Sequence, residues 1–230
     1  MKKGTVIYQI CLVLTILLLP VQGHAALISV DDVNLGVGVI TRDTDTALDW
    51  LDLTITAGTT YNYVSSQTGA GGTYQGFRHA TFAELSQFWT NAGIPEITPL
   101  FFGIGPGLFS AANRQPILDL FDLIGTTAPF PGQPIRHTLG ITQEVHLGGD
   151  GTLVFQLVAG LRTTDVAGSA DLNDSIIQPN ISDPTFGHYL VRSAPIAAIP
   201  EPETYAMLGL GLGLMGWVVR RKKLKDRAAA

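Results

Sequence analysis

Cysteine is almost missing from the 230-residue sequence, because Cys11 is the only one and it lies in an apolar stretch near the N-terminus. The rest of the chain has no thiol, which excludes disulfides, cysteine metal sites and cysteine nucleophiles. A domain without disulfides depends on its apolar core for stability. The roughly 170 residues between the two ends are enough to bury such a core.

Lysine is missing between residues 26 and 199, and positive charge is scarce there. Of the 14 Lys and Arg in the chain, two lie in the N-terminal stretch and six in the C-terminal tail, which leaves six, all Arg. Of the 19 Asp and Glu, three lie after residue 200 and 16 remain, so the formal charge of this region is near −10 with neutral His. A surface of this sign repels phosphate, and we expect no nucleic-acid partner.

Motifs of catalysis are missing as well. The histidines after the N-terminal stretch do not form His-x-x-x-His or His-Glu-x-x-His, so zinc has little support. No Gly-x-Ser-x-Gly elbow is present, and 69–72 is not followed by Gly-Lys-Thr as in a Walker loop. We therefore expect no enzyme and no catalytic residue. The four histidines are His79, His137, His146 and His188.

The N-terminus has the pattern of a signal peptide. Lys2 and Lys3 give a positive start, and an apolar region covers 6–20. Gly23 and Ala25 place small residues at the −3 and −1 positions, which predicts cleavage after Ala25. Residues 1–25 are therefore predicted to be removed on export, and the alternative is an uncleaved anchor.

The C-terminus combines three features over 200–224. A short motif comes first and consists of Pro200, Glu201 and Pro202. The next run, 205–219, is apolar and uncharged, and predicts a membrane helix of roughly 22 Å, shorter than the roughly 30 Å hydrocarbon core. A basic stop then precedes the last residues, 225–230. Because Lys and Arg favour the cytoplasmic side of a membrane, the domain before the motif should lie outside. The stop consists of Arg220, Arg221, Lys222 and Lys223.

This order of motif, apolar helix and basic stop resembles the PEP-CTERM sorting signal of Gram-negative bacteria. The resemblance implies a membrane-anchored precursor that has crossed the inner membrane. It also implies an exosortase as partner, which recognises and cleaves the signal, and transfer of the protein to the cell envelope or the exopolysaccharide matrix. The alternative is a plain membrane anchor.

Between the two signals we expect one α+β domain of short strands and two or three helices at 26–194, followed by a linker at 195–199. Trp50 and Trp89 are expected in its core, and Arg78 is expected to pair with a core carboxylate. Thr81 and Glu84 predict a helix with a capping box. Strands are predicted at 27–40, 47–56, 137–147, 152–162 and 188–192. Helices are predicted at 60–67, 81–91 and 115–124, and loops at 68–76, 97–109, 126–134 and 165–184.

The middle of the chain is also similar to the C-terminal module of Lcl-type surface adhesins. Residues 45–53 resemble the opening of that module, with its Asp and Trp. Residues 72–81, with Glu84 and Leu85, resemble its central segment, although Phe77 stands where the family has Trp. Residues 189–192 resemble its closing strand. The resemblance implies a C-type-lectin-like scaffold.

The predicted loop at 165–184 is rich in oxygen ligands. Asp165 precedes a group formed by Asp171, Asn173 and Asp174. Such side chains suit Ca²⁺, which takes about 6–8 oxygen ligands, although their order is not that of an EF-hand. The group is a calcium candidate, and the alternative is an ordinary polar loop. No other cofactor or metal is expected.

Together these patterns favour an exported protein of the cell envelope or extracellular matrix, with a structural or adhesive role beside exopolysaccharide. The alternative is a carbohydrate-binding module, and a glycan hydrolase is the third hypothesis.

Overall fold

A computed structural model of the chain describes residues 27–98, 108–128, 135–148 and 154–195. The chain divides into two units, Met1–Ala194 and Pro195–Ala230, and the fold below is that of the first. The predicted signal peptide, most of the linker, the sorting segment and the basic tail lie outside the described residues. None of the helices in the described part is long and apolar enough to cross a bilayer.

The first sheet is antiparallel and brings the two ends of the domain together. It has the order β1-β2-β3-β9-β4. The N-terminal hairpin forms one half, and β9, from the end of the domain, pairs between β3 and β4. Its strands are β1 (Leu27–Asp32), β2 (Gly36–Asp43), β3 (Leu48–Leu51), β4 (Arg78–His79) and β9 (Leu190–Ser193).

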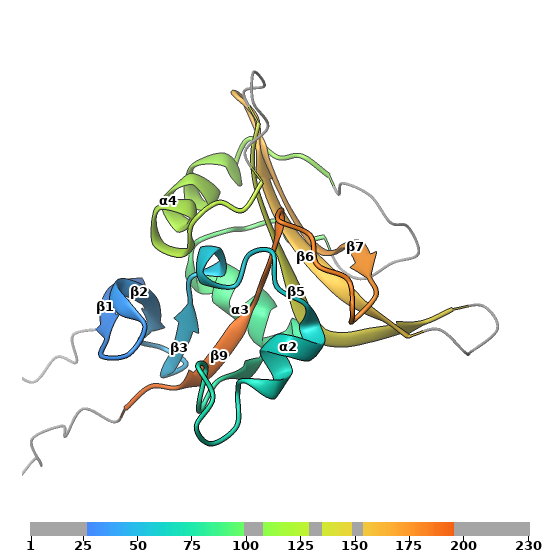
Figure 1. The fold of residues 1–230 in the computed structure, drawn as a ribbon. Helices are drawn as coiled ribbons and strands as arrows, with labels where there is room; N and C mark the ends of the chain where they lie inside the picture. Colours follow the sequence, from blue (N-terminus) through green and yellow to red (C-terminus); the bar gives the residue numbers. More distant parts are fainter. Residues whose placement is uncertain (1–26, 99–107, 129–134, 149–153, 196–230) are drawn as a thin grey trace, which may run out of the picture. The chain divides into compact units, whose positions relative to one another are not determined.

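The second sheet has the order β7-β6-β5-β8 and contains the longest strands of the domain (Figure 1). Strands β5, β6 and β7 form an antiparallel meander, and β8 pairs in parallel with β5. The strands are β5 (Arg136–Leu147), β6 (Val154–Thr163), β7 (Gly168–Ile177) and β8 (Phe186–His188).

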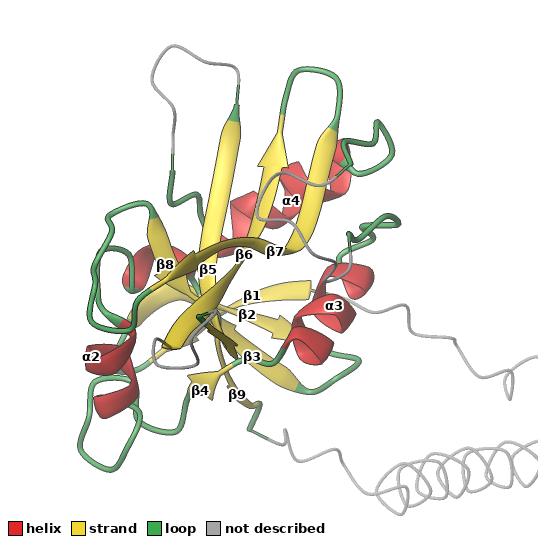
Figure 2. Cartoon of the chain, turned by 90° about the vertical axis from the view of Figure 1, so that its right-hand side faces the viewer, coloured by secondary structure: helices red, strands yellow, loops and turns green. Residues whose placement is uncertain are grey.

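Within the described residues, three α-helices and a short 3-10 helix connect and cover the strands (Figure 2). Thr81 caps α3 by accepting a hydrogen bond from the backbone N–H of Glu84, and the Glu84 side chain accepts from the backbone N–H of Thr81. The predicted capping box is therefore confirmed. The helices are η1 (Leu53–Ile55), α2 (Tyr61–Ser66), α3 (Phe82–Asn91) and α4 (Arg114–Ile124).

The main core lies between the two sheets and helices α3 and α4. Trp50 of β3 and Phe88 of α3 stack with ring centroids 4.2 Å apart. Trp50 is 2% exposed and Trp89 is fully buried, so both are core residues, as predicted. Strand β6 contributes Ala159 and Leu161 to the same cluster, which therefore joins both sheets into one core.

Glycine allows close packing on each face of the second sheet. A Cβ at Gly140 would lie 2.4 Å from the Tyr189 ring, on the face toward the main core. A Cβ at Gly160 would lie 2.3 Å from Asp174 Oδ2. A side chain at either position would therefore force the neighbouring groups to move.

Three parts of the sequence-based prediction were wrong. Strand β7 occupies the predicted loop at 165–184. The predicted strand at 188–192 is the end of one strand and the start of another, in different sheets, with Tyr189 between them. The strand predicted at 47–56 ends at Leu51, and η1 follows. The described part is mostly β with a few helices, so it contains more strand than expected.

Candidate functional site

Four charged side chains form a continuous network across the first sheet. Arg42 Nε lies 2.7 Å from Asp49 Oδ1, and Arg42 Nη2 lies 3.1 Å from Asp49 Oδ2. Arg192 Nε lies 3.5 Å from Asp49 Oδ2, and Arg192 Nη2 lies 2.8 Å from Asp32 Oδ2. The side chains come from β2, β3, β9 and β1, so the network connects four strands. Its formal charge is zero because two arginines face two aspartates.

A cavity of about 520 Å³ lies beside one end of this network. Its volume is in the range of roughly 300–1,000 Å³ that small-molecule sites occupy. Asp32 and Arg192 are its only charged lining residues among those described, and the Gly-rich segment after α2 forms another wall. The lining residues are Asp32, Asn34, Leu35, Gly71, Gly72, Thr73, Gln75, Phe77 and Arg192.

Asp32 fixes the turn that forms one edge of the cavity. Its Oδ1 accepts hydrogen bonds from the backbone N–H groups of Asn34 and Leu35, at 2.9 and 3.0 Å. Burial alone works to raise the pKa of Asp32, but these two bonds and the Arg192 guanidinium outweigh it and leave the pKa below its ordinary value. The carboxylate is therefore ionised at neutral pH and accepts hydrogen bonds only.

The Gly-rich wall is held by its own hydrogen bonds. Gln67 Oε1 accepts from the backbone N–H of Thr73, and Gln75 Oε1 accepts from the backbone N–H of Gly71. Gly71 has a φ of 79°, a left-handed conformation that favours glycine. A Cβ at Gly72 would lie 2.1 Å from the carbonyl oxygen of Gln67. Two successive glycines are therefore required for this wall to approach the end of α2.

Phe77 supports the arginine of the cavity. The Arg192 guanidinium carbon lies 4.5 Å from the centroid of the Phe77 ring, in the geometry of a cation–π contact. Phe77 is 4% exposed and Asp32 holds the other side of the same guanidinium. Arg192 is thus fixed by contacts with Asp32, Asp49 and Phe77. Arg78, which was predicted to pair with a core carboxylate, pairs instead with Glu84 of the capping box.

A second, smaller cavity lies beside a buried pair of histidines. His79 Nε2 lies 2.9 Å from His188 Nδ1, and His188 Nε2 lies 3.1 Å from the carbonyl oxygen of Thr59. A carbonyl only accepts, so His188 Nε2 carries the proton, and His188 Nδ1 accepts from His79 Nε2. The cavity measures about 260 Å³ and is lined by Tyr61, Ser65, Thr68, Arg78, His79 and Gln143.

Both histidines of this pair are neutral. Burial lowers the pKa of His79 to about 3, and the neighbouring His188 adds to the shift. Burial also lowers the pKa of His188 to about 4, although the hydrogen bond to Thr59 acts in the opposite direction. This pair could not be predicted from the sequence, because His79 and His188 lie on β4 and β8, which belong to different sheets.

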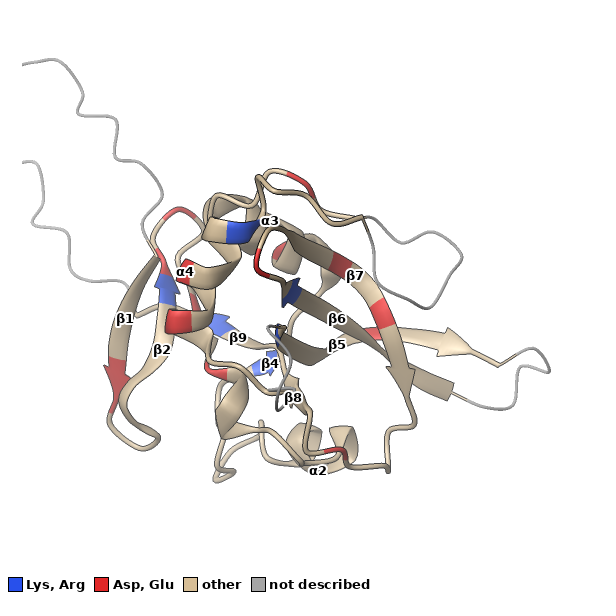
Figure 3. Ribbon diagram, turned by 90° about the horizontal axis from the view of Figure 1, so that it is seen from above, with Lys and Arg blue, Asp and Glu red and all other residues tan. Residues whose placement is uncertain are grey.

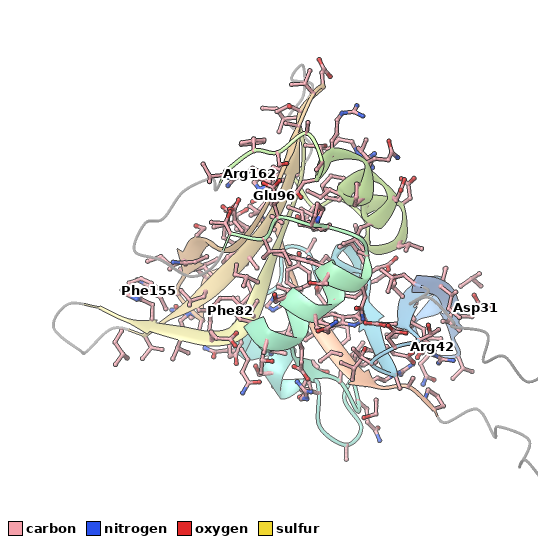
Figure 4. The ribbon with its side chains drawn as sticks, turned by 180° about the vertical axis from the view of Figure 1, so that it is seen from behind. Asp31, Arg42, Phe82, Glu96, Phe155 and Arg162 are labelled. Carbon is pink, nitrogen blue, oxygen red and sulfur yellow. The ribbon has the colours of Figure 1, made fainter. Side chains whose placement is uncertain are left out.

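The other two histidines are far from forming a pair. His137 and His146 both lie on β5, where His137 is buried near the start of the strand and His146 is exposed near its end. His137 Nε2 accepts a hydrogen bond of 2.9 Å from Arg162 Nε. Figure 4 shows Arg162 in the second sheet, well away from Arg42 of the first. Arg162 also pairs with Asp174.

The calcium candidates lie on strand β7 rather than in a loop. Asp174 forms an ion pair with Arg162, and Asp171 Oδ2 accepts a hydrogen bond from Ser169. Asp171 and Asp174 are 2% and 4% exposed. Within residues 27–98, 108–128, 135–148 and 154–195, no three His, Cys, Asp or Glu form a group that could hold a metal. Calcium at Asp171, Asn173 and Asp174 therefore stays a prediction without structural support.

The Asp49 side chain of β3 is fully buried in the charged network. Asp52 follows β3, and burial raises its pKa to about 6.

Figure 3 shows acidic positions spread over strands, helices and loops of the domain, with few basic ones among them.

The residues predicted for sorting lie outside the described residues, and the evidence for them comes from comparison. Comparison with curated proteins and with solved structures gives no match. One family model matches, the PEP-CTERM protein-sorting motif, over residues 198–223. This range includes Pro200, Glu201, Pro202 and the four residues of the basic stop. The chain therefore carries a PEP-CTERM protein-sorting motif and is an exported protein sorted by an exosortase.

Proposed function

We propose that this protein is a structural or adhesive component of the cell envelope or extracellular matrix, working beside exopolysaccharide. The observation that carries the proposal is the position of the sorting motif. The folded unit ends at Ala194 and the motif begins at residue 198. Cleavage there separates the whole domain from the membrane segment, so the domain itself is the part that acts outside the cell. We propose that it acts by contact and not by catalysis.

The test is a deletion of the gene, followed by measurement of cell attachment and matrix cohesion. We expect both to fall, and to recover when the intact gene is restored. A second strain carries the protein with Pro200, Glu201 and Pro202 replaced by alanine, which leaves the domain unchanged but removes the motif. We expect that strain to behave like the deletion. Normal attachment in the deletion strain contradicts the proposal.

The second candidate function is carbohydrate binding, and the cavity at Asp32 and Arg192 favours it. Its lining is rich in amide, hydroxyl and charged groups, which suit a ligand with many hydroxyls. The C-type-lectin-like scaffold, implied by the resemblance to the adhesin module, is a further part of this proposal. The third candidate, glycan hydrolysis, is tested by incubating the exported protein with oligosaccharides and measuring reducing ends. Release of reducing ends contradicts a purely structural role.

A further inference from the structure

We propose that the cavity between the β1–β2 turn and the Gly-rich wall, closed on one side by Arg192, binds an uncharged saccharide unit. The inference rests on the proposed function, because it takes the domain to act among glycans outside the cell. It adds the binding residues and the chemical class of the ligand. Four observations support it: the charge of the cavity, the order of its hydrogen-bonding groups, its rigidity and the side chains that remain available.

The charge of the cavity favours an uncharged ligand. Asp32 and Arg192 neutralise each other at 2.8 Å, and the network behind them is also balanced, with Arg42 facing Asp49. No described charge in the lining is left over for an anion or a cation. The region between residues 26 and 199 carries a formal charge near −10 with neutral His. A field of this sign disfavours uronate polymers and other polyanions.

The hydrogen-bonding groups of the cavity alternate in a way that suits neighbouring hydroxyls. The Asp32 carboxylate accepts, and the Arg192 guanidinium next to it donates. One hydroxyl of a sugar donates to the first while the oxygen of the adjacent hydroxyl accepts from the second. A phosphate or carboxylate ligand only accepts, so it pairs with Arg192 but is repelled by Asp32. The pair of Asp32 and Arg192 therefore favours a ligand that both donates and accepts hydrogen bonds over an anion that only accepts them.

The cavity is already formed, which limits the entropy lost on binding. Arg192 is fixed between Asp32, Asp49 and the ring of Phe77. On the opposite wall, Gln67 holds Thr73 by its backbone N–H and by its hydroxyl. Both walls are held by contacts within the domain, and hydrogen-bonding groups fixed in advance are typical of small-molecule sites.

Two exposed side chains remain available to a ligand at the rim. Asn34 lies on the turn held by Asp32. The hydrogen bond to Asp32 comes from the Asn34 backbone N–H and not from the side-chain amide. Thr73 lies on the facing wall, where its hydroxyl donates to Gln67 Oε1 and its hydroxyl oxygen can still accept a hydrogen bond from a ligand. Because neither side chain holds a strand in place, each can be shortened while Asp32, Arg192 and the fold are left intact. These are the residues on which the proposal is tested.

The experiment is calorimetric titration of the exported protein, purified from the envelope, with hexasaccharides of known charge. The probes are neutral glucan and mannan hexasaccharides, and an oligogalacturonate of the same length. We expect at least one neutral probe to bind, and Asn34→Ala and Thr73→Ala each to weaken it about three- to tenfold, the effect of one lost hydrogen bond. Asn62→Ala is the matched control, because Asn62 is exposed on α2 and does not line the cavity.

Three results overturn the proposal. The first is that the protein binds none of the probes. The second is that the Asn34, Thr73 and Asn62 variants bind the neutral probe equally well. The third is that the protein binds the oligogalacturonate more tightly than the neutral probes. Attachment and location are scored separately in cells. A protein that reaches the envelope and supports attachment, but binds no probe, overturns the cavity proposal alone. A protein that binds a neutral probe, but is not needed for attachment, overturns the adhesive role alone.

Discussion

Arg192 Nη2 lies 2.8 Å from Asp32 Oδ2, so a residue of the last strand of the domain holds a residue of the first. The same arginine reaches Asp49 of β3, which in turn is held by Arg42 of β2. Strands that are far apart in the sequence are therefore connected by one set of charges. Two members of this set, Asp32 and Arg192, also line the larger cavity, so closure of the domain and formation of the candidate site share these two side chains.

Removal of Asp49 should destabilise the domain strongly. Its side chain is fully buried and faces two arginines, and Asp49→Ala removes the carboxylate from Arg42, whereas Arg192 keeps its ion pair with Asp32. Breaking a buried pair costs about 3–5 kcal/mol, and we expect the lower end because Arg42 and Arg192 each reach solvent. Urea unfolding of the purified protein measures the change. Asp45→Ala is the control, because Asp45 is exposed in the turn between β2 and β3. Equal midpoints for both variants contradict the role of the network.

Local features of the fold could be predicted from the sequence, and long-range ones could not. Thr81 and Glu84 stand three residues apart, so their capping box depends only on neighbouring residues. The sequence predicts a loop where β7 lies, because Asp171 and Asp174 look solvent-facing. Their burial depends on Ser169 and on Arg162 of the neighbouring strand.

The larger cavity was also beyond prediction from the sequence. Its lining comes from the β1–β2 turn, the segment after α2 and strand β9, which have no spacing or motif in common. The position of Arg192 against Asp32 follows only from the insertion of β9 between β3 and β4. The sorting motif is the opposite case, because all of its features lie within one short segment and in a fixed order.

The cap of helix α3 makes a second measurable contribution. Thr81→Ala removes the acceptor of the Glu84 backbone N–H, and the expected loss in the free energy of unfolding is about 1 kcal/mol. Thr90→Ala is the matched control on the same helix, since the Thr90 hydroxyl donates to the Ser86 carbonyl and caps nothing. Urea unfolding should show a lower midpoint for the first variant and an unchanged slope. A midpoint equal to that of the wild type contradicts the capping role.

The buried histidine pair should make stability fall in acid. The pKa values of His79 and His188 are about 3 and about 4 in the folded protein, against an ordinary value near 6.5. Between about pH 6.5 and 4 the unfolded chain binds protons that the folded protein does not, so stability falls as pH falls through this window. At pH 5 the loss is up to about 2 kcal/mol for each histidine.

Unfolding of the wild type and of His79→Gln between pH 7 and 5 isolates this effect. The variant should lose less stability over this range, because one of the two buried groups is gone. Asp52, with its pKa raised to about 6 by burial, acts in the opposite direction but is present in both proteins. His146→Gln is the control and should follow the wild type, since His146 is exposed. Parallel curves for wild type and His79→Gln would exclude the pair as the cause.

Processing at the C-terminus is the last prediction, and it concerns the segment before the apolar run at 205–219. Pro200 and Pro202 fix their own φ angles, and each restrains the residue before it to extended conformations. The sequence therefore predicts an extended, polar segment before the apolar run, and such a segment is a suitable substrate for a protease. The apolar run contains Gly209 and Gly213, and this spacing allows another helix to approach closely, as recognition by a membrane enzyme requires.

We therefore expect the mature protein to lack both ends, the signal peptide before about residue 26 and the apolar run with its basic stop. Intact mass of the protein from the envelope or the medium measures this. Replacement of Pro200, Glu201 and Pro202 by alanine, or loss of the exosortase, should leave the tailed precursor in the membrane. Substitution of Asp45 by alanine is the control, since it lies in the folded domain and should not change processing. A mature surface form that still contains Trp217 and Arg220 would mean that the motif is not cleaved and that the segment is a permanent anchor.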